Sequence, residues 1–458
     1  MCGIKIYATL VLAAFLFTSN SDSLRGDEPA GKIEVAFDVS MVDWPTEPPA
    51  HVMNNPAKLK AWQEATWGEK GLETAMDTAL AAGAKRVNFR VHAAGPYWPT
   101  KVPGAAASMV SETDAKSKGI PSLSHTWDRW NMVQAAARIA HGKGVKLMAW
   151  FDLTEGHGGS PTKWALNHPE LCIVDRKGIR LDGPVGIANK KGVRLEKTRK
   201  DMSYNTLIRE GFMTAKCERP DGTSIDPHLS IAYPQVVEYR IALIKELLSF
   251  GVDGILLVVC SSVGYESPVI ESFMKEHGID PRKIGEHDPR WIKHQARYFT
   301  DFVRKVNQVI RDEERKSGRK LEFIIEGQGG FPGPNQNMQP EAGLPHVWRW
   351  AFMPDYVDTE TIAKEKLADG LSFWTLREAK NLSPQARANV KLFTRYRYSG
   401  DSFTQERFNT RIAEAQKQGF FCLILNESRT PLATMRWLYP GKPGPLFELN
   451  RKLSAMSK

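Results

Sequence analysis

The sequence predicts a single (β/α)8 barrel, and three observations favour this fold. A fully apolar run, Ile255 to Val259, follows an amphipathic helix that begins near Pro234. A helix followed by a strand that is buried on both faces is the half-unit of a parallel α/β fold. Further strand-like runs mostly alternate with helical patterns, and the 458 residues show no second regime of composition. Together these features indicate one closed barrel rather than two domains.

The expected strands are short runs rich in apolar residues and bounded by Gly, Pro, Asn or Asp. In chain order they are Ile33 to Val39, Arg86 to His92, Val145 to Asp152, Ile255 to Val259, Leu321 to Glu326, a short segment near Tyr356 to Asp358, about Val390 to Tyr396, and Phe420 to Asn426. Eight such strands are the number that a (β/α)8 barrel needs.

Helix starts are marked by capping residues. Asn55 and Asp288 each precede a proline, which is the favoured order at a helix N-terminus. Thr126 is expected to cap another helix, and Ser402 with Gln405 forms a capping box. The pattern thus places a helix after most of the strands.

A long insertion is expected between strands three and four, from Glu155 to about Tyr233. It is rich in Gly and in Lys and Arg, so it is either a solvated charged surface or a basic wall beside the site. Cys172 and Cys217 bracket its irregular part, and the two would be able to pair in an oxidising compartment.

The N-terminus resembles a secretory signal peptide. Lys5 precedes an almost wholly apolar run, Ile6 to Phe17, which small polar residues follow up to Ser23. We therefore expect residues 1–23 to be removed, residues 24–32 to form a spacer, and residues 33–458 to form the exported barrel, in the periplasm or outside the cell. An uncleaved anchor is the alternative, but the apolar run falls short of the ~20 residues that span a bilayer.

The net charge of the chain and the motifs that it lacks indicate which binding partners to expect. The formal net charge of +10 favours an acidic polysaccharide or an anionic cell surface. Nucleic acid is not expected, because no basic helix or aromatic RNA-binding signature accompanies the charge. No cofactor or metal is expected either, because the chain has no Cys-x-x-Cys and the candidate ligands His92, Asp152 and His157 lack paired spacing.

The predicted strand ends carry many carboxylates interleaved with aromatic residues. In a (β/α)8 barrel these ends build the active site. The mixture suits a sugar, whose apolar faces stack on rings while its hydroxyls bind charged groups. The residues expected to contact a polysaccharide or oligosaccharide are Arg90, His92, Trp98, Trp150, Tyr265, Gln328, Trp348, Trp350, Asn426 and Glu427.

Glycoside hydrolysis requires two carboxyl groups, one of which donates a proton to the leaving oxygen. Glu326 is the best candidate for this acid, because Ile324 and Ile325 precede it and a glycine-rich loop follows. The alternative is a Glu326 that is merely neutralised by an arginine such as Arg90. Asp152 or Asp358 would supply the second carboxyl group, although the alternative is that either only orients Arg90 or His92.

Several segments together resemble the glycosyl-hydrolase-like family 10 proteins, from about Ile33 to the last strand. They are Met41 to Pro45, Asn88 to Pro99, Gly144 to Phe151, His168 to Glu170, and Val252 to Ile255. The resemblance implies an exported barrel that acts on polysaccharide. The chain departs from the family pattern where an acidic pair and a tyrosine usually follow the Asp-Gly-Ile segment, because Val258, Val259 and Cys260 occupy these places.

This departure leaves three hypotheses. The leading one is an exported glycoside hydrolase, in which Glu266 or another strand replaces the missing carboxylate. The second is an inactive carbohydrate-binding barrel, since valine neither transfers protons nor attacks carbon. The third is a structural protein of the cell envelope whose basic insertion adheres to anionic polymer.

Overall fold

The computed structural model describes the regions that form the barrel and its helices. The described residues are 33–40, 55–58, 68–81, 83–92, 95–106, 130–153, 156–157, 160–174, 176, 217–218, 224–225, 229–259, 263–285, 287–327, 340–341, 344–350, 355–396 and 405–425. The predicted signal peptide and spacer lie outside these residues, as do most of the basic insertion and the predicted helix cap Thr126. Among the described residues, no helix is both long and apolar enough to cross a membrane.

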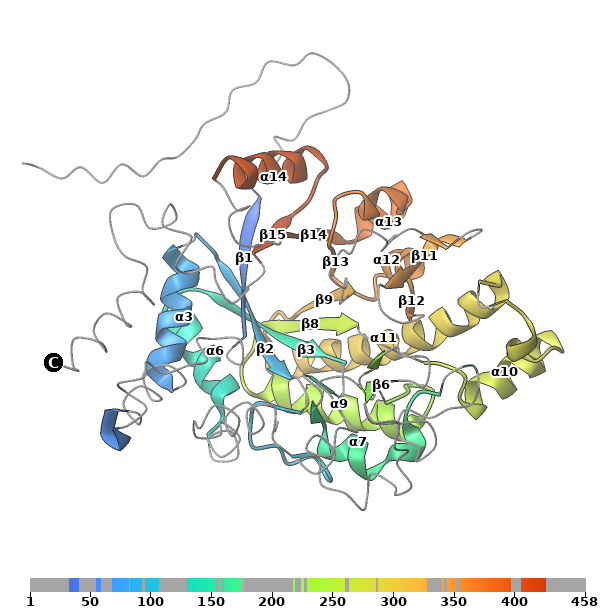
Figure 1. Cartoon of the computed structure of the whole chain (residues 1–458). Helices are drawn as coiled ribbons and strands as arrows, with labels where there is room; N and C mark the ends of the chain where they lie inside the picture. Colours follow the sequence, from blue (N-terminus) through green and yellow to red (C-terminus); the bar gives the residue numbers. More distant parts are fainter. Residues whose placement is uncertain are drawn as a thin grey trace, which may run out of the picture.

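Eight parallel strands close into a barrel, which confirms the predicted fold class (Figure 1). Around the barrel they are β1 (Glu34–Val39), β2 (Arg86–His92), β3 (Lys146–Asp152), β8 (Gly254–Val259), β9 (Glu322–Gly327), β13 (Gly370–Phe373), β14 (Lys391–Tyr396) and β15 (Cys422–Leu425). The circle closes through parallel pairing of β1 with both β2 and β15. Their C-terminal ends therefore meet at one mouth of the barrel.

The predicted sixth barrel strand was wrong. The segment near Tyr356 forms β12 (Asp355–Asp358), which pairs antiparallel with β11 (Leu344–Trp350). Together with β10 (Pro340–Glu341) these strands form a separate three-stranded sheet, and β13 is the sixth strand of the barrel. The strand β13 is only four residues long and contains Gly370 and Ser372, so its apolar signal is weaker than that of the Tyr-Val pair in β12.

Helices surround the strands (Figure 1). They are α3 (Glu69–Ala81), α6 (Met132–Gly142), α9 (Pro234–Ser249), α10 (Ser267–His277), α11 (Pro289–Ser317), α12 (Thr359–Lys364), α13 (Pro384–Asn389) and α14 (Gln405–Lys417). Asp288 caps α11 as predicted, and its carboxylate accepts from the Arg290 N–H at 2.9 Å. The described cap of α6 is Asn131, which accepts from the Gln134 N–H at 3.0 Å.

Short elements fill the remaining connections. They are β4 (Gly156–His157), β5 (Ser160–Pro161), α7 (Lys163–Asn167), β6 (Cys217–Glu218), β7 (Ser224–Ile225) and the 3-10 turns η1 (Pro169–Leu171), η3 (Pro281–Lys283) and η4 (Glu378–Asn381). Cys172 is buried. Because the structure does not describe the Cys217 side chain, the pairing of these two cysteines stays a prediction.

The barrel interior is apolar in its middle and charged at both ends. The apolar layer consists of Ala36, Met148, Leu256, Val258, Ile324, Phe393, Cys422 and Ile424. At the N-terminal mouth, buried Arg86 donates to Glu34 at 2.8 Å and to Glu322 at 2.5 Å. These ion pairs balance the charge of buried Arg86 at the N-terminal mouth, whereas (β/α)8 enzymes place their catalytic residues at the opposite mouth.

Candidate active site

A buried arginine joins two carboxylates at the C-terminal mouth. The Nε of Arg395, near the end of β14, lies 2.6 Å from the Glu326 carboxylate at the end of β9. The same guanidinium group also forms an ion pair with Asp38 on β1. Ser372 on β13 donates to Glu326 at 2.8 Å, and Asn88 on β2 donates to Asp38 at 2.8 Å. Five strands thus contribute to one network of buried polar groups.

A second ion pair lies on the neighbouring strands β2 and β3. Asp152, the last residue of β3, accepts from Nε of Arg90 at 2.9 Å and lies 2.7 Å from its Nη2. The indole N–H of Trp150 donates to the same carboxylate at 2.7 Å. The guanidinium carbons of Arg90 and Arg395 lie 5.2 Å and 5.1 Å from the centre of the Trp150 ring. Trp150 therefore connects the two arginine–carboxylate groups.

Burial controls the protonation of these carboxyl groups. It raises the pKa of Glu326 to about 7, and the nearby Asp38 adds to the rise while Arg395 opposes it. Burial likewise raises the pKa of Asp38 and of Asp152, against the charges of Arg395 and Arg90. Three carboxyl groups face two guanidinium groups, so one bound proton would balance the charge. Glu326 is consequently able to hold a proton near neutral pH, as a general acid must.

The resemblance predicts a carboxylate pair on strand four, and Val258 and Val259 occupy these two places. In the barrel register, Val258 on β8 pairs with Asp152 on one side and with Glu326 on the other. The valine side chain is buried in the apolar layer of the barrel interior. An apolar residue therefore separates the two predicted catalytic carboxylates.

Glu266 does not replace that carboxylate. Its side chain accepts from the Gly264 N–H with both oxygens, at 3.0 Å and 2.8 Å, at the start of α10. The group is fully enclosed, and burial raises its pKa to about 7. These contacts give Glu266 a structural role in holding the loop after β8.

Asp358 was predicted to end a barrel strand, and this prediction was wrong. Asp358 lies at the end of β12, outside the barrel, and not at the end of a barrel strand. Its carboxylate caps α12 by accepting from the Thr361 N–H at 2.9 Å and from the Thr361 hydroxyl at 2.8 Å. Both oxygens thus have local partners.

Two predicted aromatic contacts lie in the core instead of at the mouth. Trp98 is fully buried, its indole N–H donates to Glu246 on α9 at 2.9 Å, and its ring packs edge-on against Phe250. The Tyr265 ring is also buried, 4.8 Å from that of Trp291 on α11. A sugar cannot stack on either ring in this structure.

His92 is enclosed as well. Its ring lies 4.6 Å from that of Phe151 and is 1% exposed. Burial, together with the charges of Arg240 and Arg90, lowers the pKa of His92 to about 3. The ring is therefore neutral and belongs to the wall of the barrel.

The other predicted contacts lie where no side chain is described. Gln328, Asn426 and Glu427 fall outside the described residues, and Trp348 and Trp350 lie on β11 with undescribed side chains. Their roles stay predictions.

The site residues on or next to β13 were not predicted, because the sixth strand was placed at β12. They are Ser372, which binds Glu326, and the half-buried Trp374, whose ring centre lies 5.3 Å from the Arg395 guanidinium carbon. A Trp directly after the Gly-Leu-Ser-Phe run was the sequence signal that would have located them.

Comparisons with known proteins leave the activity of this chain open. No family model matches the chain, and no curated protein matches it. Among solved structures, α-L-fucosidase isoenzyme 2 from Paenibacillus thiaminolyticus is 12% identical over 93% of this chain and 49% of the fucosidase, with a TM-score of 0.45. The chain thus spans about half the length of that enzyme.

Two further glycosidases are similar to this chain. The catalytic domain of a β-amylase from Paenibacillus polymyxa is 11% identical, over 93% of this chain and 99% of the amylase, with a TM-score of 0.48. An α-galactosidase from Thermus thermophilus is 14% identical, over 92% of this chain and 62% of that enzyme, with a TM-score of 0.36. At such identities no activity transfers to this chain, because one barrel fold serves many chemistries. The resemblance to glycosyl-hydrolase-like family 10 therefore rests on the sequence motifs alone.

Proposed function

We propose that the chain is an exported glycoside hydrolase that acts on a polysaccharide at the C-terminal mouth of its barrel. The observation that carries this proposal is the cluster of Glu326, Asp152 and Asp38 at one mouth of the barrel, beside the half-buried Trp150 and Trp374. Burial also raises the pKa of Glu326 to about 7, which suits a group that donates a proton at neutral pH. Its position at the end of a barrel strand is where (β/α)8 enzymes place their catalytic residues.

In this proposal Glu326 protonates the leaving glycosidic oxygen. Ser372 and Arg395 orient its carboxyl group from the two following strands. Asp152 is the second carboxylate, because it has Arg90 as a counter-ion of its own and accepts an N–H from Trp150. Asp38 shares Arg395 with Glu326, so it tunes the proton affinity of the acid.

The substrate class follows from the aromatic and charged groups at the same mouth. In this proposal the half-buried Trp150 and Trp374 supply the rings on which a sugar face stacks. The net charge of +10 favours an acidic polysaccharide. Both features support carbohydrate binding beside Glu326.

The decisive experiment compares two substitutions on the same strand. Glu326→Gln is expected to lower turnover of aryl glycosides or oligosaccharides by about 100-fold or more while leaving the Kd for the substrate unchanged. Glu322→Gln is the matched control, because Glu322 is also buried and paired with an arginine, but at the opposite mouth. Turnover by Glu326→Gln that equals turnover by Glu322→Gln would show that Glu326 is not the acid.

An inactive carbohydrate-binding barrel is the second candidate, and Val258 is the observation that favours it. A valine stands between Asp152 and Glu326, and each carboxylate is paired with an arginine. This candidate predicts that the wild-type chain binds polysaccharide without cleaving any member of a glycoside panel. The substitution Trp374→Ala would then weaken binding, whereas binding through the basic insertion alone would survive it and fall steeply with salt.

Export is tested separately. Sequencing the N-terminus of protein recovered from outside the cytoplasm is expected to give a start near residue 24. Recovery of the protein only in the membrane fraction with Met1 retained would favour the uncleaved anchor.

A further inference from the structure

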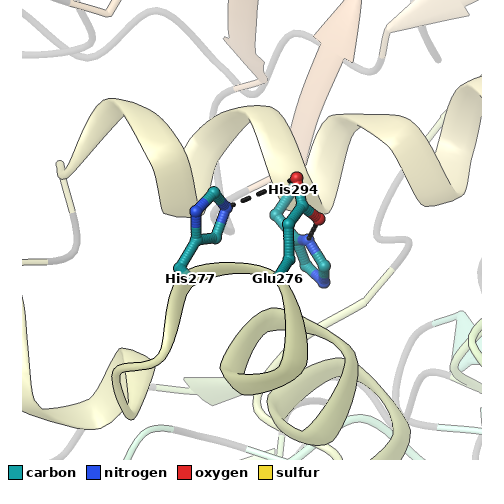
Figure 2. A group of neighbouring side chains, drawn as sticks. All are labelled: Glu276, His277 and His294. Carbon is teal, nitrogen blue, oxygen red and sulfur yellow. Dashed lines mark hydrogen bonds and ion pairs between the residues drawn. The ribbon is translucent and has the colours of Figure 1, made fainter.

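Three residues that can bind a metal meet between two helices outside the barrel. Glu276 and His277 end α10, and His294 lies on the first turns of α11 (Figure 2). Figure 2 shows the Glu276 carboxylate between the two imidazole rings. None of these residues belongs to the proposed catalytic site.

The spacing of the three groups fits a small coordination shell. The Glu276 carboxylate lies 3.5 Å from Nε2 of His277 and 3.2 Å from Nδ1 of His294. Zinc bonds of about 2.0–2.1 Å in tetrahedral geometry place neighbouring ligand atoms roughly 3.3 Å apart. All three candidate ligand atoms lie within 4.8 Å of one another, so small rotations of the side chains would close the shell.

The hydrogen bonds of His294 fix the tautomer that a metal requires. A guanidinium group can only donate, so Nδ1 of His294, 2.7 Å from Nη2 of Arg297, accepts. The other ring nitrogen, Nε2, then carries the hydrogen and donates to the Ser272 hydroxyl oxygen at 2.9 Å. The lone pair of His294 is then on Nδ1, which faces Glu276. Imidazoles that bind metals commonly donate their other N–H to an oxygen in this way.

A cationic group already occupies part of this space. Nη2 of Arg297 lies 2.7 Å from Nδ1 of His294 and 2.5 Å from Glu276. The Arg297 side chain is half exposed, so it can turn out to solvent. The C-terminal end of α10, which closes at Gly278, adds the partial negative charge of its last carbonyl groups. The Glu276 carboxylate, Nδ1 of His294 and the end of α10 therefore all attract a positive charge.

We propose that Glu276, His277 and His294 form a binding site for a divalent transition metal of the zinc class, with Arg297 as the group that the metal displaces. Three protein ligands leave a fourth position for water. Because the ligands come from two helices, the bound metal would cross-link α10 to α11.

Titration calorimetry with Zn²⁺ and the visible absorption of bound Co²⁺ test the site on the full chain. The wild-type chain is expected to bind Zn²⁺ at this site and to give the absorption of low-coordinate Co²⁺. His277→Ala and Glu276→Gln, whose side chains are partly exposed, are expected to lose both signals. His287→Ala is the matched control, because His287 is exposed and lies outside the cluster.

Two further substitutions separate a built site from adventitious binding to a surface histidine. Ser272→Ala is expected to weaken Zn²⁺ binding by about 10-fold, as loss of an outer-shell partner does. Arg297→Gln is expected to strengthen it, because the competing cation is removed. Zn²⁺ binding that is equal in the wild type, His277→Ala and Glu276→Gln would overturn the proposal. Glu326→Gln should bind Zn²⁺ like the wild type, so this test is independent of the proposed hydrolase.

Discussion

The Glu326 carboxylate and the Arg395 guanidinium group form a buried ion pair of 2.6 Å across the C-terminal mouth of the barrel. Each side chain is 1% exposed. Because Arg395 also pairs with Asp38, two carboxyl groups share one arginine, and a proton on Glu326 balances the remaining charge. This arrangement decides how the site responds to substitution.

Loss of Arg395 should destabilise the barrel strongly. In Arg395→Met, Glu326 and Asp38 lose their shared counter-ion while they stay buried. Breaking a buried ion pair in this way typically lowers the free energy of unfolding by about 3–5 kcal/mol. Urea unfolding at neutral pH measures the effect.

The triple variant Asp38→Asn, Glu326→Gln, Arg395→Met serves as the control for lost packing. It should recover much of the stability, because no uncompensated charge remains. A triple variant as unstable as Arg395→Met would show that packing, and not charge, causes the loss.

Glu266 should make stability depend on pH. Burial raises its pKa from 4.5 to about 7 in the folded chain, so the folded state holds the proton more tightly than the unfolded state. Glu266 therefore contributes its full share to the free energy of unfolding below about pH 4.5. This contribution is lost as the pH rises to about 7, by at most about 1.4 kcal/mol per pH unit.

Glu266→Gln removes that titration and keeps an oxygen that accepts from the Gly264 N–H. The variant should therefore gain stability relative to the wild type between pH 5 and pH 8. Urea unfolding of both proteins at the two pH values gives the comparison. If the free energy of unfolding of Glu266→Gln differed from that of the wild type by the same amount at both pH values, the prediction would be contradicted.

Sequence patterns predicted most of the barrel because strands such as β8 and β9 contain an uninterrupted apolar run, Ile255 to Val259 in β8 and Phe323 to Ile325 in β9. They failed at β13, where Gly370 and Ser372 interrupt the run while paired strands and covering helices still bury it. The strand exists because β9 and β14 bind it on both sides, and this information is not local.

The candidate site was predictable in part. The positions of Glu326 and Asp152 followed from strand ends, and so did the pairing of Asp152 with Arg90, but the pairing of Glu326 with Arg395 did not. Arg395 meets Asp38 only because barrel closure brings β14 and β1 together on either side of β15. Trp98 shows the opposite error, since an aromatic residue after a strand can turn outward onto a helix as readily as into the mouth.

Gly254 should tolerate no side chain. It has a positive φ of 155°, and an added Cβ would lie 2.0 Å from the Glu322 carbonyl oxygen on β9. Because the obstacle is backbone, β8 and β9 would have to separate, so Gly254→Ala should lower stability by more than the roughly 1–3 kcal/mol of ordinary overpacking. Thermal unfolding measures the change in Tm.

Gly142→Ala is the matched control for Gly254→Ala. An added Cβ at Gly142, the last residue of α6, meets no atom within 4 Å. Its Tm should be unchanged or higher, because alanine favours the helix. Equal losses in the two variants would refute the steric argument at Gly254.

Glu246 should stabilise the loop after β2 without contributing to carbohydrate binding. Its carboxylate accepts from the Trp98 indole N–H at 2.9 Å, the Thr100 hydroxyl at 2.6 Å and the Lys101 N–H at 2.7 Å. Glu246→Ala leaves the fully buried indole N–H without this acceptor. The expected loss is about 1–3 kcal/mol in the free energy of unfolding, measured by urea unfolding.

Glu246→Gln keeps one acceptor oxygen and should lose less stability than Glu246→Ala. The same proteins test the placement of Trp98, because a ring held in the core by Glu246 contributes nothing to the Kd for an oligosaccharide. Trp98→Phe should therefore lower stability and leave that Kd unchanged, whereas Trp374→Ala should change the Kd. If Trp98→Phe weakened oligosaccharide binding as much as Trp374→Ala, the Trp98 ring would have to reach the mouth of the barrel, contrary to its position against Phe250.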